Sequence, residues 1–305
     1  MSMKKVPVTE GNAPAQAAVE EIEAPESQWK AMWESLWGNK AAVVGLFVIA
    51  FLALVAIFGP LIMPYDPNLQ NLSESFQWPS SEHWFGTDQL GRDIFSRIIA
   101  GTRISLTVGL SAVAISLTIG IILGAIAGYR GGMADTIIMR FMDMMLAIPS
   151  ILLAIAFMAA LGKGIDKAII AIGLVSIPEY ARIVRGCILS VKENDYVQAA
   201  RVIGNKDGRI ILHHILPNVI SSIVVRATLG ISTAVLDTAA LGFLGLGVQP
   251  PAAEWGDMLG RARGFIFQAP YTLIFPGIAI TITVLAFNLL GDGLRDALDP
   301  KSRKV

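Results

Sequence analysis

Residues 41–63 read AAVVGLFVIAFLALVAIFGPLIM, a run without a single charged side chain. Crossing the hydrocarbon core of a bilayer as an α-helix takes about 20 apolar residues. Three further runs, at 104–129, 144–162 and 269–291, are also free of charge. These four runs predict four transmembrane helices. They also explain why only 16% of the 305 residues are charged, against about 25% in soluble domains.

Two more apolar stretches are less uniform. Residues 168–178 are apolar but short, and charged side chains follow them at helical spacing. Residues 219–248 are long enough to cross a bilayer, but Arg226 and Asp237 interrupt them. We count both stretches as spans, because a polar group in a span can face a bundle interior or a water-filled path. The sequence therefore predicts an all-α polytopic membrane protein with six transmembrane helices.

The distribution of positive charge predicts how the chain is oriented. If the N-terminus lies inside, sixteen Lys and Arg residues fall on the inner side and seven on the outer side. Because an excess of Lys and Arg marks the cytoplasmic side, both termini are expected in the cytoplasm. The net charge of zero gives no indication of nucleic-acid binding. The single cysteine, Cys187, allows no intrachain disulfide.

The ends of the chain differ in character from its apolar runs. Residues 1–25 are rich in Ala, Glu and Pro, which predicts disorder, and they lack the apolar core of a signal peptide. In the next stretch Trp29, Trp33, Leu36 and Trp37 fall on one helical face, as in helices that lie in the membrane interface.

The expected segments are a disordered cytoplasmic tail at 1–28, an amphipathic elbow helix at 29–40, transmembrane helix 1 at 41–63, a periplasmic segment at 64–103, a core of helices 2–6 at 104–291 containing a long inner loop at 192–217, and a cytoplasmic C-terminus at 292–305.

The inner loop 192–217 carries the most informative motif. Asp195, followed three residues later by Gln198, is typical of a helix start with a capping box. The alanine pair at 199–200 favours helix and leaves room for another backbone to approach. Gly204 permits the left-handed turn that ends a helix, and Pro217 is expected to break the second helix just before span 5. The loop is thus predicted to hold a short rigid helix that transmits a push from a soluble partner to the bundle.

This loop resembles the "EAA" loop of ABC importer permeases, in which Glu-Ala-Ala is followed by a spaced Gly and a Leu-Pro pair. Gln198 stands where that pattern has Glu, and a neutral amide can still form hydrogen bonds. The matching residues are Ala199, Ala200, Gly204, Leu216 and Pro217. The resemblance implies that the short helix docks into a groove of an ATPase subunit. The residues assigned to this coupling helix are Asp195, Tyr196, Gln198, Ala199, Ala200, Arg201, Gly204 and Pro217.

Other motifs extend the resemblance from about Trp29 to the end of the chain. They are Phe85-Gly86-Thr87-Asp88 with Gly91-Arg92-Asp93, Arg140-x-x-Asp143 with Pro149, Asp237-x-x-Ala240-Leu241-Gly242, Gln249-Pro250-Pro251 with Glu254-Trp255-Gly256, and Asn288-x-x-Gly291-Asp292 with Asp299-Pro300. Together they resemble the dipeptide/oligopeptide permease family, and within it the second, C-type permease subunit. The fold implied is that of a type I ABC importer permease in the bacterial inner membrane.

The resemblance implies a machine made of several proteins. The expected partners are a second permease subunit, ABC ATPase subunits, an extracytoplasmic solute-binding protein and a peptide substrate. The chain has no Gly-x-x-x-x-Gly-Lys-Ser/Thr loop to hold phosphates, so it is expected not to be an enzyme and to carry no cofactor, with ATP and Mg held by the partner ATPases. Alternatives are import of nickel chelates or another small solute by the same machinery, and an ion-coupled secondary transporter.

Several charged residues allow two interpretations. Asp237 lies in an apolar span, where it either lines the translocation path or subunit interface or serves as a buried structural partner. The outer residues assigned to contact with a binding protein are Asp88, Arg92, Asp93, Glu254 and Trp255; the other interpretation of this region is an ordered cap over the bundle.

Charged residues near the inner ends of spans are expected to pair locally. These are Glu179, Arg182 and Arg185 with one another, and Arg140 with Asp143. No metal site is assigned, because the adjacent His213 and His214 point about 100° apart on a helix.

Overall fold

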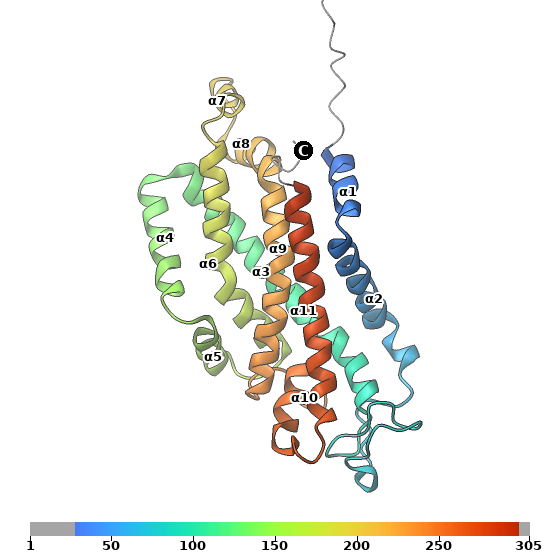
Figure 1. The fold of residues 1–305 in the computed structure, drawn as a ribbon. Helices are drawn as coiled ribbons and strands as arrows, with labels where there is room; N and C mark the ends of the chain where they lie inside the picture. Colours follow the sequence, from blue (N-terminus) through green and yellow to red (C-terminus); the bar gives the residue numbers. More distant parts are fainter. Residues whose placement is uncertain (1–27, 299–305) are drawn as a thin grey trace, which may run out of the picture.

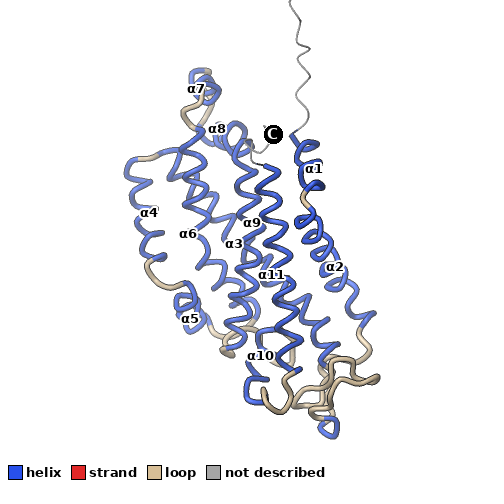
Figure 2. Tube along the Cα trace, viewed as in Figure 1, coloured by secondary structure: helices blue, strands red, loops and turns tan. Residues whose placement is uncertain are grey.

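The computed structural model describes residues 28–298, and side chains from Trp33 onward. The predicted tail, apart from Gln28, and residues 299–305 of the predicted C-terminal segment lie outside the described residues. Within that range the chain consists of helices and loops, without a strand (Figure 2). The long helices are α2 (Lys40–Ile62), α3 (Ile94–Arg130), α6 (Ile165–Val191), α9 (Leu216–Phe243) and α11 (Tyr271–Leu298). The shorter elements are α1 (Gln28–Gly38), η1 (Leu72–Glu74), α4 (Gly132–Leu146), α5 (Ser150–Leu161), α7 (Asp195–Val202), α8 (Asp207–Ile210), η2 (Ile211–Ile215), α10 (Trp255–Ala262) and η3 (Arg263–Phe265).

The long helices run between two ends of the molecule that differ in content. Helices α1, α7 and α8 and the C-terminal end of α11 gather at one end (Figure 1). Helix α10 and the loop between α2 and α3 lie at the opposite end. Both ends of the described chain are thus on the side of α7, an arrangement that fits the predicted common side of the two termini. We call these the α7 end and the α10 end.

Four helical segments are long and apolar enough to cross a membrane: 40–62, 94–130, 207–243 and 271–298. The pair α4 and α5 adds a fifth if the two helices form one span. Helix α6, the remaining predicted span, is 27 residues long but carries Asp166 and Lys167 in its first turn and three more charged residues, Glu179, Arg182 and Arg185, in its second half. The predicted count of six therefore stays a prediction.

Two predicted boundaries differ from the structure. The helix expected from residue 104 begins at Ile94, because the side chain of Asp93 accepts the backbone N–H of Ser96 and caps the first turn. The run 144–162 is not one helix: α4 and α5 meet at a bend of 94°. Pro149 explains the bend, since a proline disfavours helical backbone at the residue before it, Ile148.

Helix α3 is the centre of the bundle and packs against α6, α9 and α2. Its contact with α6 depends on glycines four residues apart. A side chain at Gly120 would place a carbon 2.5 Å from Cβ of Tyr180, and one at Gly124 would lie 2.5 Å from the carbonyl oxygen of Ala181. Small residues at this spacing let two helix backbones approach closely. On the other side α11 packs between α2 and α9.

Pro217 does not end a helix, contrary to the prediction from the sequence. Helices α8 and α9 are joined by η2, a π-helical turn, into one continuous helix from Asp207 to Phe243. Pro217 lies in the first turn of α9. A proline lacks the N–H for an i to i−4 bond and its ring crowds the carbonyl of the preceding turn. The wider π turn just before Pro217 relieves that crowding, so α9 is connected rigidly to the inner loop.

Candidate functional site

Helix α7 is fixed to the bundle by one apolar face. Val197 and Ala200 are buried in a cluster with Tyr129 at the end of α3 and with Ile210 and Ile215 before α9. An eight-residue helix is too short to be stable by itself in water. Its position therefore depends on this cluster, which connects it to both α3 and α9.

A polar network reinforces the same connection. Arg201 donates from Nε to the hydroxyl of Tyr129 over 3.3 Å, and its guanidinium lies over the tyrosine ring, 5.1 Å from the centroid. The hydroxyl of Tyr129 in turn donates to Oδ1 of Asp207 in α8, at 3.2 Å. Three elements are thereby joined through one phenol group. Tyr129 and Asp207 were not among the predicted site residues, and the aromatic residue at the end of a span was the available signal.

The predicted end of α7 is confirmed and the helix begins at Asp195 as expected, but the predicted capping box is wrong. Gly204 has φ +86°, and the N–H groups of Gly204 and Asn205 bond back to the carbonyls of Arg201 and Ala200, the pattern of a Schellman cap. At the other end the N-cap is Asn194, without a side-chain cap bond. Gln198 forms no capping box, because its amide donates instead to the carboxylate of Glu193 at 3.0 Å.

The opposite face of α7 and the turn after it project from the molecule (Figure 1). Val202 is 88% exposed, Ile203 80% and Tyr196 41%, and Ala199 is also exposed. Ala200 is buried, so only one of the two alanines is available to a partner. Two branched apolar side chains this open to solvent are typical of a docking surface. We call Tyr196, Ala199, Val202 and Ile203 the α7 surface; Val202 and Ile203 were missed in the sequence, although they are adjacent apolar residues in a polar loop.

Asp237 lies on α9 and lines a cavity of about 250 Å³. The walls come from the bend between α4 and α5, from the middle of α6 and from α9. The lining residues are Met145, Leu146, Ile148, Pro149, Ser150, Val175, Ser176, Glu179, Tyr180, Arg226, Gly230, Thr233 and Asp237. We call this space the Asp237 cavity.

The ion pairs near the Asp237 cavity connect different helices, whereas the sequence predicted local pairs. Glu179 of α6 pairs with Arg226 of α9. Asp143 of α4 pairs with Arg182 of α6 at 2.7 Å and not with Arg140. In the same way the carboxylate of Asp135 accepts two bonds from Arg185, at 2.5 and 2.6 Å. The predicted pairs are therefore wrong, because packing brings α4 and α9 against α6 and supplies partners that sequence spacing does not show.

The outer residues assigned to a binding-protein contact are all internal. Asp88, Arg92, Asp93, Glu254 and Trp255 are no more than 7% exposed. The carboxylate of Asp88 accepts from the guanidinium of Arg92 at 2.7 Å within a loop. Buried side chains cannot touch another protein, so the prediction of direct contact is wrong and the alternative, an ordered cap, describes them.

The cap is held together by hydrogen bonds of Glu254 and Trp255. The carboxylate of Glu254 accepts the backbone N–H groups of Gly256 and Asp257, both at 2.8 Å, and caps α10. The indole of Trp255 donates to the carbonyl of Ile98 at 3.1 Å, which joins α10 to α3. Burial raises the pKa of Glu254 to about 7, although the two backbone bonds act in the opposite direction. The cap therefore contains a carboxyl group that titrates near neutral pH.

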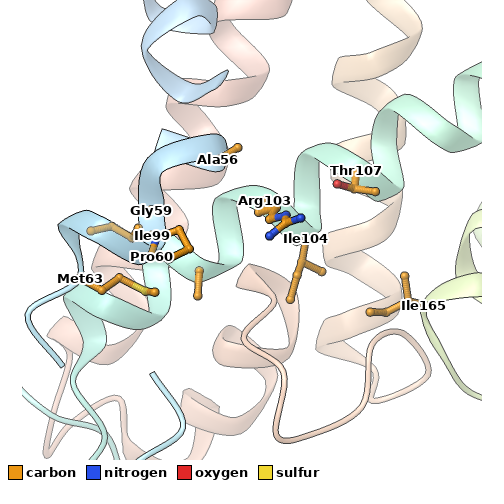
Figure 3. A pocket seen from close by; sticks show the side chains of 10 residues that line it. Ala56, Gly59, Pro60, Met63, Ile99, Arg103, Ile104, Thr107 and Ile165 are labelled. Atoms are coloured by element: carbon orange, nitrogen blue, oxygen red, sulfur yellow. The ribbon is translucent and has the colours of Figure 1, made fainter. Parts of the chain in front are cut away.

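A larger cavity, of about 390 Å³, lies between α2 and α3 near the α10 end (Figure 3). Most of its lining is aliphatic. Arg103 is its one charged lining residue, and Thr107 adds a hydroxyl. This cavity shares no lining residue with the Asp237 cavity.

Comparisons with known proteins agree over nearly the whole chain. Residues 120–304 match the family described as binding-protein-dependent transport system inner membrane component, and residues 27–79 match the N-terminal TM domain of oligopeptide transport permease C. The dipeptide transport system permease protein DppC of Alkalihalophilus pseudofirmus is 52% identical over 91% of each chain. The glutathione transport system permease protein GsiD of Pectobacterium atrosepticum is 49% identical over 90% of this chain and 91% of its own. Among solved structures, an inward-facing MetNI methionine ABC transporter chain aligns with a TM-score of 0.56 at 20% identity, covering 67% of this chain and 97% of its own, which supports the fold.

Proposed function

The chain belongs to the family of binding-protein-dependent transport system inner membrane components, and from that premise we propose that it is the permease subunit of an ABC importer for dipeptides or short oligopeptides. Such a chain is a multi-pass protein of the bacterial inner membrane and is not itself an enzyme. The observation that best supports a peptide as the substrate is the 52% identity to a dipeptide permease over 91% of both chains. Family membership also argues against the alternative of an ion-coupled secondary transporter.

We assign the contact with the ATPase subunits to the α7 surface. It offers Val202 and Ile203 to a groove, while Val197 and Ala200 hold the helix to the bundle. A movement of α7 would pass through Tyr129 into α3 and through the continuous helix 207–243 into α9. ATP and Mg would be held by the partner ATPases. The chain would thereby convert the closure of the ATPase subunits into a rearrangement of its own helices.

The second permease subunit is proposed to cover the side of the bundle formed by α4 and α5. Large apolar side chains are exposed on this side, where a helix of the partner subunit or lipid would cover them. They are Met133, Ile137, Phe141, Met144, Ile148 and Leu152. The Asp237 cavity is lined by the bend between α4 and α5 together with α6 and α9, so a partner on the α4–α5 side would lie next to it. We therefore assign the cavity to the translocation path between the two permeases.

Glutathione is the second candidate substrate, because a glutathione permease is 49% identical to this chain. Nickel chelates and other small solutes remain alternatives without a supporting similarity among the relatives compared. The test uses the complete importer in nanodiscs with its ATPases and its solute-binding protein. The rate of ATP hydrolysis is measured with the binding protein alone and after loading it with a dipeptide, glutathione or a nickel chelate. Stimulation by the dipeptide supports the proposal. Stimulation by glutathione alone, or by the nickel chelate alone, would make that ligand the assigned substrate. If no ligand stimulates ATP hydrolysis, the assignment is overturned.

A further inference from the structure

The Asp237 cavity is built where three helices cannot close on one another. The 94° bend between α4 and α5 leaves the backbone at Ile148 and Pro149 away from α6 and α9. Gly230 of α9 makes room for the hydroxyl of Tyr180, with which a side chain at that position would collide. At about 30 Å³ per water, a volume of about 250 Å³ corresponds to about eight waters. The cavity thus has room for one end of a small molecule.

Most polar groups in the lining are already occupied. Glu179 and Arg226 pair with each other, so their charges cancel. The hydroxyl of Ser176 donates to the carbonyl of Ile172 at 3.0 Å, one turn back on its own helix. The hydroxyl of Thr233 turns back in the same way toward Leu229. The donor hydrogens of these hydroxyls are therefore already used, although their oxygens can still accept a bond.

Two groups differ from the rest. Among residues 33–298 the carboxylate of Asp237 has neither a hydrogen bond nor an ion pair. The hydroxyl of Tyr180, which is only 2% exposed, also has no partner within that range. An unpaired carboxylate in a membrane span is costly and marks a functional site by default. The lining carries a net charge of −1, because Asp237 has no cation to balance it.

We propose that Asp237 binds the free α-ammonium group of a peptide as the peptide passes through the permease. The proposal rests on the function proposed above. An ammonium group brings three donors and one positive charge, and a peptide amino terminus, with an ordinary pKa of about 7.7–8.0, is mostly charged at neutral pH. A divalent metal ion fits less well, since Ca²⁺ takes six to eight oxygen ligands. The permease itself therefore selects for a free amino terminus.

The test removes the negative charge at position 237 and then restores it. Cys187 is the chain's only cysteine, so Cys187→Ser provides a background in which Asp237→Cys introduces a single thiol. The complete importer is reconstituted in proteoliposomes with ATP inside, and uptake of a labelled dipeptide is measured. Treatment with an anionic methanethiosulfonate reagent restores a negative charge at position 237, and a cationic reagent of similar size places the opposite charge there. Thr228→Val, on the same helix but outside the lining, is the matched control.

The expected result is at least a tenfold loss of dipeptide uptake in Asp237→Cys and in Asp237→Asn. The anionic reagent should recover most of the loss and the cationic reagent none, while Thr228→Val matches the parent protein. Co-purification of the second permease subunit is measured on the same samples. Uptake at the parent rate in Asp237→Asn would overturn the proposal, and so would loss of the second subunit, because Asp237 would then be an interface residue. If the parent protein takes up no peptide at all, the failure belongs to the proposed function.

Discussion

Arg201 of α7 donates a hydrogen bond to the hydroxyl of Tyr129 at the end of α3, and its guanidinium carbon lies 5.1 Å from the centre of the tyrosine ring. The same hydroxyl donates to Asp207, at the start of the long helix that continues as α9. One phenol group therefore joins the helix proposed to receive the ATPase to two helices of the bundle. The strength of this connection can be measured.

Tyr129→Phe is predicted to loosen α7 without unfolding the bundle. The change removes both hydrogen bonds of the hydroxyl but keeps the ring that packs against Val197. Each such bond contributes about 1 kcal/mol, so opening of α7 should become about tenfold or more easier. Hydrogen exchange of the amides at 195–203 measures this opening. Tyr196→Phe, on the exposed face, is the control and should leave the exchange unchanged. Equal exchange in both variants would show that the network is unimportant.

Replacing Val202 and Ile203 by aspartate is predicted to release the ATPase subunits. Both side chains are more than three-quarters exposed, so the change should not disturb the fold of this chain. Charge in an apolar groove is costly to bury, and the fraction of ATPase that co-purifies should fall at least tenfold. Leu72→Asp is the matched control, since Leu72 is 70% exposed at the α10 end. Retained ATPase in the double variant would move the docking site away from the α7 surface.

Glu254 is predicted to make the outer cap more stable at lower pH. Burial raises its pKa to about 7 from an ordinary value of 4.5. Between these two values the folded chain keeps a proton that the unfolded chain has lost, so stability falls as pH rises from about 4.5 to about 7 and is then constant. The shift corresponds to on the order of 3 kcal/mol.

The measurement for Glu254 is the thermal unfolding midpoint of the purified protein between pH 5 and pH 8. Glu254→Gln should flatten the dependence, because an amide cannot titrate. Glu82→Gln, at an exposed position in the same cap, should keep the slope of the parent protein. A slope that persists in Glu254→Gln would assign the effect to another group.

Gly124→Ala is predicted to destabilise the contact between α3 and α6. The new methyl carbon would lie 2.5 Å from the carbonyl oxygen of Ala181, so the helices must separate. Overpacking of this kind costs about 1–3 kcal/mol, which should lower the unfolding midpoint by several degrees. Gly186→Ala is the matched control on α6, where no atom lies within 4 Å; there the better helix propensity of alanine should leave the midpoint equal or higher. Equal midpoints for the two variants would contradict the close packing.

The sequence predicted the apolar spans well because charge-free runs are a property of consecutive residues. The run 41–63 coincides with α2 within one residue, and Gly204 ends α7 as expected. The failures concern residues whose role depends on distant segments. Asp143 pairs with Arg182 because α4 packs against α6, and sequence spacing contains no information on that packing.

Burial was the other property that the sequence could not supply. Asp88 and Glu254 are polar residues in loops, which ordinarily favours a surface position, yet both are buried by contacts among the loop 64–93, α3 and α10. Val202 and Ile203 show the reverse, since apolar residues stand exposed where a partner is expected. The Asp237 cavity also escaped prediction, because its wall includes the bend at Pro149, which brings residues of α4 and α5 together with α6 and α9.

The most direct test of the central claim is uptake of a labelled dipeptide into proteoliposomes that contain the complete importer and its binding protein. Uptake is compared with ATP inside, with a non-hydrolysable analogue inside, and with an ion gradient alone. Accumulation is expected only with ATP, and the Val202→Asp/Ile203→Asp variant should lose it. Accumulation driven by the ion gradient without ATP would show that the chain is not part of an ATP-driven importer.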